Sequence, residues 1–183
     1  LPVQSGSDKI LKLMNRKHLI KDFIKTYEKL KKINSSIEFS SDFIIAYPGE
    51  EEKDFDATFN LIENIRFINS YSYIFSPRPG TAAAHSKLID KKISQRRLEK
   101  IQRQLFDNQI NMNNKLKFKE IDVLVENKTK DNLKLFGRSE YMTPVIFEGK
   151  ESDIGNIVKV KILESNQNTL FGENLENSEK KVA

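Results

Sequence analysis

Cysteine is absent from the 183 residues of the chain. Without a thiol, these residues can form no disulfide, no thiolate zinc site, no cysteine nucleophile and no cysteine ligand to an iron–sulfur cluster. Histidine is scarce as well, since His18 and His85 are the two present and they lie far apart in the sequence. We therefore expect neither catalytic side chains nor a metal site within this chain.

Long apolar runs are also missing. No segment approaches the roughly 18 to 20 apolar residues that cross a bilayer, and no basic-then-apolar leader opens the chain. The sequence therefore predicts a soluble, cytoplasmic protein without a membrane partner. Its first residues, Leu1 to Gln4, read as the end of a strand whose start is missing, which indicates a fragment.

The charge is uneven although the net value is only +5. Residues 87–119 contain 10 basic and 3 acidic side chains, a balance that can attract phosphate groups. A solvated helix face would show the same pattern, so the composition leaves both readings open.

Residues 1–86 alternate helical and strand-like patterns. Ser7 is a candidate N-cap, and Pro48-Gly49 stops an apolar run that is typical of a strand buried on both faces. Alternation of this kind favours a parallel α/β sheet or barrel with right-handed crossovers. The predicted order is helix 8–14, helix 20–30, strand 37–47, a helix after residue 50, strand 71–75 and helix 90–117.

The apolar period changes to two after residue 120. Alternating residues and intervening glycines predict short strands, and such a set is typical of a small antiparallel, OB-like β-barrel. The five predicted strands cover 121–126, 133–136, 145–147, 158–163 and 169–171. We expect domain limits at 1–116 and 117–174, with a disordered tail over 175–183.

Three Gly-containing stretches follow the predicted strands of the α/β part: 4–7, 47–50 and 76–81. Ligands of parallel sheets bind at the carboxyl ends of strands, so these stretches are expected to share one rim. Taken singly, each stretch could equally be an ordinary turn without a ligand, because Gly, Pro and Ser are common turn residues.

These stretches resemble a known family. The segments 1–16, 42–50 and 73–82 are similar, in this order, to motifs of the radical S-adenosylmethionine (SAM) methylthiotransferases. The segments 137–139, 145–149 and 170–173 resemble the TRAM domain of that family, a small RNA-binding barrel. The resemblance implies the C-terminal part of a radical-SAM partial (β/α) barrel followed by a TRAM barrel.

The resemblance also implies a function. The forms at 76–81 and 145–149 are most similar to members that add a methylthio group to carbon 2 of an isopentenylated tRNA adenosine beside the anticodon. Sister enzymes modify a threonylcarbamoylated tRNA adenosine or a ribosomal protein, and a non-catalytic RNA-binding module is a further alternative. The cofactors implied are SAM and two 4Fe–4S clusters. Because this chain has no cysteine, it cannot ligate either cluster, and the fragment alone should be inactive. The partners implied are the tRNA anticodon stem-loop and an electron donor of the reductase or flavodoxin type.

Site residues follow from the matching positions. Ala46 stands where family members usually have glycine, and an Ala82-Ala83 pair replaces a usual Pro-Ala. The residues expected to bind SAM are Gln4, Ser5, Arg16, Ile45, Tyr47, Pro48, Gly49, Ser76 and Arg78. From their charge and position, the candidates for RNA binding are Arg96, Arg97, Lys100, Lys134, Arg138 and Tyr141.

Overall fold

A computed structural model describes residues 1–175, which fall into two compact units. The first unit runs from Leu1 to Asn108, and the second begins at Gln109. Each has its own hydrophobic core, and Met112 and Leu116 pack in that of the second. The tail expected over 175–183 lies, apart from Leu175, outside the described residues.

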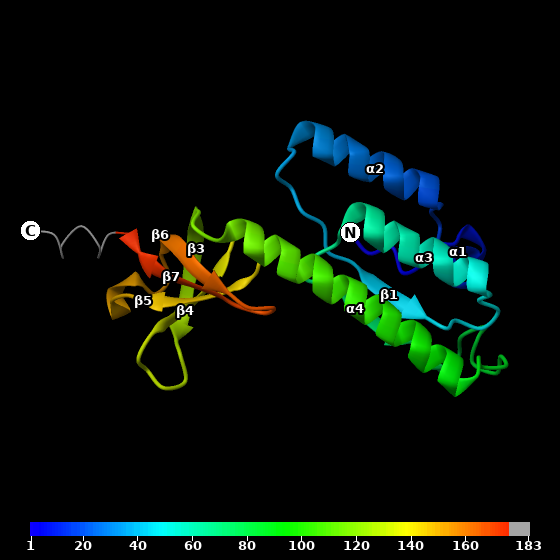
Figure 1. The fold of residues 1–183 in the computed structure, drawn as a ribbon. Helices are drawn as coiled ribbons and strands as arrows, with labels where there is room; N and C mark the ends of the chain where they lie inside the picture. Colours follow the sequence, from blue (N-terminus) through cyan, green and yellow to red (C-terminus); the bar gives the residue numbers. More distant parts are fainter. Residues whose placement is uncertain (176–183) are drawn as a thin grey trace, which may run out of the picture. The chain divides into compact units, whose positions relative to one another are not determined.

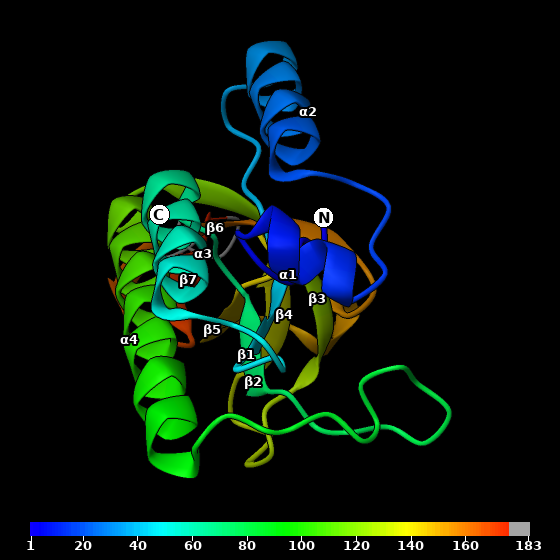
Figure 2. The same ribbon diagram turned by 90° about the vertical axis from the view of Figure 1, so that its right-hand side faces the viewer.

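The first unit alternates helices and strands as the sequence predicts (Figure 1). Strands β1 and β2 pair in parallel with Asp42 opposite Tyr71, and Gln4 forms a further parallel bridge to Phe43. Figure 2 shows α3 and the first part of α4 along one side of this small sheet. The elements are α1 (Asp8–Leu13), α2 (Ile20–Ile33), β1 (Asp42–Ile45), α3 (Glu52–Ile65), β2 (Tyr71–Ile74) and α4 (Lys91–Leu116).

Aromatic and aliphatic side chains from both strands and helices fill this first core. The rings of Phe43 and Phe67 meet edge to face with centroids 5.3 Å apart, a favourable arrangement for aromatic pairs. Ile62 of α3 and Ile101 of α4 are fully buried in the same core. Burial of an apolar stripe on each helix therefore fixes α3 and α4 beside the sheet.

Strand β1 is shorter than the strand expected over 37–47. Ala46 has a φ of 59°, which takes the chain out of the extended region directly after Ile45. On the other side, Phe39 and Ser41 accept backbone bonds from Ile68 and Tyr71 without forming a continuous ladder. The apolar composition of residues 37–47 therefore indicates that the segment is buried. It does not show that all of these residues pair as a β-strand.

The second unit forms a closed barrel in the order β3-β4-β5-β7-β6. All five strands expected from the sequence are present, although β5 and β7 pair in parallel. The small barrel expected from the sequence is thus present with four antiparallel neighbouring pairs, and the fifth pair is parallel for a topological reason. Strand directions cannot alternate all the way around a closed ring of five, so at least one neighbouring pair must be parallel. The elements are β3 (Glu120–Lys128), β4 (Leu135–Ser139), β5 (Pro144–Glu148), η1 (Glu151–Asp153), β6 (Ile157–Ser165) and β7 (Leu170–Asn174).

Two barrel glycines allow strands to approach closely beside irregular pairing. A Cβ atom on Gly137 would lie 2.4 Å from the backbone oxygen of Leu124, and one on Gly172 would lie 2.4 Å from that of Lys161. The register of β3 and of β6 shifts close to these positions. Bulges increase local coiling, and glycine is the residue that lets the neighbouring backbone follow it.

Candidate functional site

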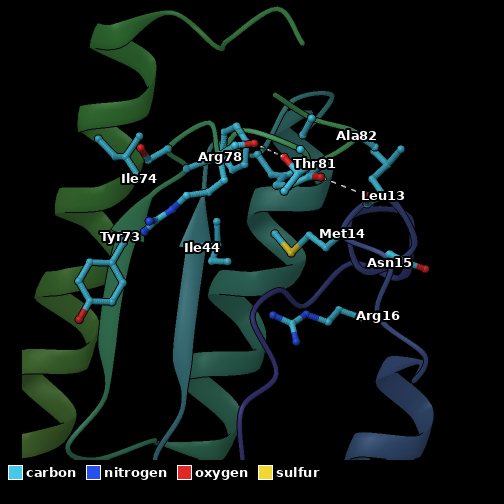
Figure 3. A pocket seen from close by; sticks show the side chains of 15 residues that line it. Leu13, Met14, Asn15, Arg16, Ile44, Tyr73, Ile74, Arg78, Thr81 and Ala82 are labelled. Atoms are coloured by element: carbon cyan, nitrogen blue, oxygen red, sulfur yellow. Dashed lines mark hydrogen bonds between the residues drawn. The ribbon is translucent and has the colours of Figure 1, made fainter. Parts of the chain in front are cut away.

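A pocket of about 820 Å³ lies at the carboxyl ends of β1 and β2 (Figure 3). Its wall comes from the end of α1, from β1 and the turn after it, and from β2 with the loop that follows. The volume is within the range usual for small-molecule sites. The lining residues are Leu13, Met14, Asn15, Arg16, Ile44, Tyr47, Tyr73, Ile74, Phe75, Ser76, Arg78, Gly80, Thr81, Ala82 and Ala83.

The end of α1 positions Arg16. Ser7 caps the start of this helix, as predicted, by accepting a bond from the Ile10 N–H. At the other end Asn15 has a φ of 58°, and its N–H bonds to the Lys12 carbonyl while the Arg16 N–H bonds to that of Leu11. These two bonds form a Schellman motif, which stops the helix and turns the chain toward the pocket.

The turn after β1 positions Tyr47. Its hydroxyl donates to the Leu13 carbonyl at 3.0 Å, and its ring meets the ring of Phe75 at 4.7 Å between centroids. The turn requires positive φ at Ala46 and at Gly49, where φ is 87°. The positive φ at Ala46 gives a physical reason for glycine at this position in the resembling family.

The loop after β2 completes the wall. Thr81 donates from its backbone and its hydroxyl to the Arg78 carbonyl, at 3.2 and 2.8 Å. This turn leaves the Arg78 guanidinium free to extend along the pocket. In Figure 3 the guanidinium group of Arg16 points toward the side of Ile44, whereas that of Arg78 ends beside Tyr73.

The pocket is positively charged. Arg16 and Arg78 line it, and none of the lining residues is acidic. Within residues 1–175, neither guanidinium forms an ion pair. Two uncompensated guanidinium groups above an apolar floor suit a ligand with an anionic group and an apolar or aromatic body.

The structure brings four of the expected SAM-binding residues to this pocket: Arg16, Tyr47, Ser76 and Arg78. The side chain of Ile45 is fully buried in the core instead, and its neighbour Ile44 lines the pocket. This follows from the two-residue period of a strand. That period is the signal that could have found Ile44, whereas nothing in the sequence singled out Phe75 or Met14.

The remaining expected residues lie outside the lining. Pro48 is buried and Gly49 exposed, both in the turn beside Tyr47. Gln4 and Ser5 are almost completely buried. The Ser5 hydroxyl lies 3.2 Å from that of Thr58, which also accepts the Gly6 N–H at 2.8 Å.

The stretch Gln4 to Ser7 is in fact tied to α3. Ser7 donates to an Asp54 oxygen at 2.7 Å, and a Cβ on Gly6 would lie 2.4 Å from the Ala57 carbonyl oxygen. Burial alone would raise the pKa of Asp54, but hydrogen bonds from the Glu51 N–H, from Lys9 and from Ser7 hold that pKa below its usual value. Close backbone approach to α3 therefore explains Gly6 without a ligand.

The expected RNA-binding residues have different surroundings. Arg97 is only 5% exposed and is paired with acidic side chains, so it does not lie on a surface that could contact RNA. Lys100 lies over the rings of Phe55 and Phe59, at 5.4 and 4.1 Å. By contrast, the side chain of Arg96 is 70% exposed.

On the barrel, Arg138 bonds to Glu126 at 3.1 Å and lies 5.8 Å from the centre of the Phe136 ring. Lys134 is exposed at the end of the loop 129–134, directly before β4, and its N–H and carbonyl both bond to Thr129. Tyr141 packs partly buried against the barrel core. These three residues therefore occupy β4 and the loops at its ends.

No group of His, Asp or Glu side chains that could hold a metal ion occurs among the described residues, and the whole sequence has no cysteine. The donor set of this chain therefore does not fit an iron–sulfur cluster. In residues 1–175, no helix is long and apolar enough to cross a membrane.

Comparisons with known proteins agree with the two units. Residues 1–62 match the family model of the radical SAM superfamily, and residues 114–175 match that of the TRAM domain. Several relatives carry the name tRNA-2-methylthio-N(6)-dimethylallyladenosine synthase. The one from Pelagibacter ubique is 63% identical over 183 residues, all of this chain and 41% of the relative. Those from Vesicomyosocius okutanii and Wolbachia pipientis are 46% and 41% identical, over 94% of this chain and 39% and 40% of their own lengths.

The chain thus spans less than half the length of the curated relatives that it matches. Both halves of the resemblance drawn from sequence motifs are confirmed, because the radical SAM match covers the first motifs and the TRAM match covers the barrel. The chain is therefore similar, along its whole length, to part of these synthases, as a segment that matches the radical SAM superfamily followed by a TRAM domain.

Proposed function

We propose that this chain is part of an enzyme that adds a methylthio group to carbon 2 of an isopentenylated adenosine beside the tRNA anticodon. The observation that carries the proposal is the 63% identity, along the entire chain, to a protein named for this product. A tRNA substrate also agrees with the match to the TRAM domain. Such an enzyme would act in the cytoplasm, where tRNA is modified.

The pocket at the ends of β1 and β2 would hold SAM. SAM has a carboxylate, which suits the guanidinium groups of Arg16 and Arg78, and an aromatic base, which suits the wall formed by Ile44, Tyr47 and Phe75. When bound at a reduced cluster, SAM supplies the radical chemistry that removes hydrogen from the adenine. The residues of this chain would bind and orient it.

The first unit would then be the later portion of a radical-SAM partial (β/α) barrel. Its parallel pair β1–β2 and the crossover through α3 are the repeating unit of such a barrel. Two 4Fe–4S clusters would be held by cysteines outside this chain, because it contains none. An electron donor of the reductase or flavodoxin type would reduce them.

The tRNA anticodon stem-loop would contact the TRAM barrel and exposed basic side chains. Arg138, Lys134 and Tyr141 are the candidates on the barrel, and Arg96 and Lys100 are those on α4. Phosphate contacts provide most of the sequence-independent affinity for nucleic acid and make that affinity depend on salt.

Calorimetry with SAM tests the cofactor site in the full-length, cluster-loaded protein. We expect Arg16→Ala to weaken SAM binding by about tenfold or more, because it removes one charge-assisted contact to the carboxylate. Lys17→Ala is the matched control, since Lys17 is the adjacent cation and does not line the pocket. Unchanged affinity in Arg16→Ala would remove Arg16 from the site.

Nucleoside analysis of tRNA from a deletion strain tests the substrate. Loss of the 2-methylthio group from the isopentenylated adenosine is the expected result. Loss of the methylthio group from threonylcarbamoyladenosine, or from a ribosomal protein, would instead assign the chain to a sister enzyme. A strain with all three modifications intact would favour a non-catalytic RNA-binding role.

A further inference from the structure

An ion-pair cluster with a buried centre joins α4 to the turn after β1 and to the first residue of α3. The Arg97 guanidinium donates to Glu50 Oε1 at 2.8 Å and to Glu52 Oε2 at 2.7 Å. It also donates to the Glu50 backbone carbonyl at 3.2 Å. The side chains of Arg97 and Glu50 are 5% and 1% exposed, so this contact is shielded from water.

Glu50 connects Arg97 to the turn after β1 through hydrogen bonds. The oxygen that accepts from Arg97 also accepts from the Ala46 N–H at 3.1 Å, and the Glu50 N–H donates to the Tyr47 carbonyl at 2.9 Å. One carboxylate therefore closes the turn from Ala46 to Gly49, in which both end residues have positive φ. Such a conformation persists where its surroundings impose it.

This turn positions one wall of the pocket. Tyr47 lies between the two ends of this turn, and its ring and hydroxyl contact Phe75 and the Leu13 carbonyl. All three residues line the pocket. A shift of the turn would therefore move the aromatic wall, although Arg97 itself does not line the pocket.

We propose that Arg97 is a positioning residue for the cofactor pocket, which acts by holding the Glu50 carboxylate beneath the turn from Ala46 to Gly49. The inference rests on the proposed SAM site. It assigns Arg97 a task different from the RNA contact expected from its place in a basic stretch. Among residues 1–175, the exposed neighbour Arg96 has no such link to the turn and pairs with Glu52 at 3.6 Å.

The charge state of Glu50 gives the physical reason for an arginine here. Burial raises the pKa of Glu50, and the nearby Arg97 guanidinium opposes that shift. Without Arg97, a buried carboxylate would be left uncompensated or would take up a proton. Protonation makes the carboxyl oxygen a weaker acceptor for the Ala46 N–H, and an uncompensated carboxylate is stabilised by moving toward water, away from that N–H.

The test compares SAM affinity with thermal stability in the full-length, cluster-loaded protein. The variants are Arg97→Met, Arg97→Lys, Glu50→Gln and the double variant Arg97→Met with Glu50→Gln. Arg103→Met is the matched control, because Arg103 is an exposed arginine on the same helix. Affinity for tRNA is measured alongside, at one stated salt concentration.

We expect Arg97→Met to weaken SAM binding at least tenfold at a temperature where the protein remains folded, with tRNA affinity unchanged. Arg97→Lys should recover part of the loss, since a lysine can still pair with Glu50. Adding Glu50→Gln to Arg97→Met should cost less than Glu50→Gln does alone, because the two side chains act as a pair. If Arg97→Met does not fold, Arg97→Lys and Glu50→Gln carry the comparison.

Two outcomes would overturn the inference. A lowered melting temperature with unchanged SAM affinity would show that Arg97 only stabilises the fold. A loss of tRNA affinity without loss of SAM affinity would return Arg97 to an RNA-binding role. Absence of SAM binding by the unmodified protein is a separate result, which would refute the proposed cofactor site and with it this assignment.

Discussion

Replacing Thr58 by valine should loosen the packing between the Gln4–Ser7 stretch and α3. The Thr58 hydroxyl is almost completely buried and accepts the Gly6 N–H at 2.8 Å, lies 3.2 Å from the Ser5 hydroxyl and donates to the Asp54 carbonyl at 3.2 Å. Valine has nearly the same shape, so the change removes the hydrogen bonds without opening a cavity.

The magnitude follows from the groups left behind. A buried donor without a partner costs about 1–3 kcal/mol, and a second lost bond of ordinary strength costs about 1 kcal/mol. Because the Gly6 N–H is only partly buried, we expect a total of about 2–3 kcal/mol. This corresponds to a local opening equilibrium that is about 30 to 150 times more favourable.

Hydrogen exchange of the full-length protein measures this local opening directly, without assuming that the whole protein unfolds in one step. Amides of residues 3–11 and 52–62 should exchange faster by this factor. Thr26→Val is the matched control, since Thr26 donates to the carbonyl four residues earlier in the same way but is exposed. An acceleration below about threefold in Thr58→Val would show that water replaces the hydroxyl and would refute this reasoning.

Two further substitutions test local strain and charge. Ala46→Gly should stabilise the turn by about 0.5–1 kcal/mol. It removes a positive-φ penalty of about 1–2 kcal/mol, and the higher conformational entropy of glycine in the unfolded chain offsets about 0.4–1 kcal/mol of that gain. Unchanged or faster amide exchange in the turn would contradict this. The second substitution concerns pH. The pKa of Asp54 in the folded protein lies below its usual value of 3.8, so the ionised side chain contributes its full stability above pH 3.8. This contribution is lost as the pH falls through the pKa of the folded state. Between about pH 5 and pH 3, the melting temperature should therefore fall more steeply in the unmodified protein than in Asp54→Asn, and parallel curves would rule out this role.

Most elements could be predicted because they depend on local patterns. Alternation of apolar residues over β3 and β6 identifies half-buried strands without knowledge of their partners. Pairing is different, because it depends on which strands meet. The parallel contact of β5 with β7 joins strands separated by η1 and β6, and no local period reports such a contact.

The candidate site was predictable in part for a related reason. Three strand ends could be placed on one side of a parallel sheet from topology alone, and the pocket does draw on the turns after β1 and β2. The Gln4–Ser7 stretch also follows a strand-like segment, but its polar groups bond to α3. These bonds join residues 47 and 52 positions apart, so only the tertiary structure could separate a turn that binds ligand from one that binds a helix.

Arg96 and Arg97 show what a charge count leaves out. The two adjacent arginines contribute equally to the basic excess of residues 87–119, yet one side chain is 70% exposed and the other 5%. The helical period could have distinguished them, because Arg97, Ile101 and Leu105 follow one another at intervals of four and all three are buried. An arginine on the apolar stripe of a helix requires a buried acid, which Glu50, at the end of the turn after β1, provides. The phase of a basic residue on its helix therefore carries more information about its role than the number of basic residues around it.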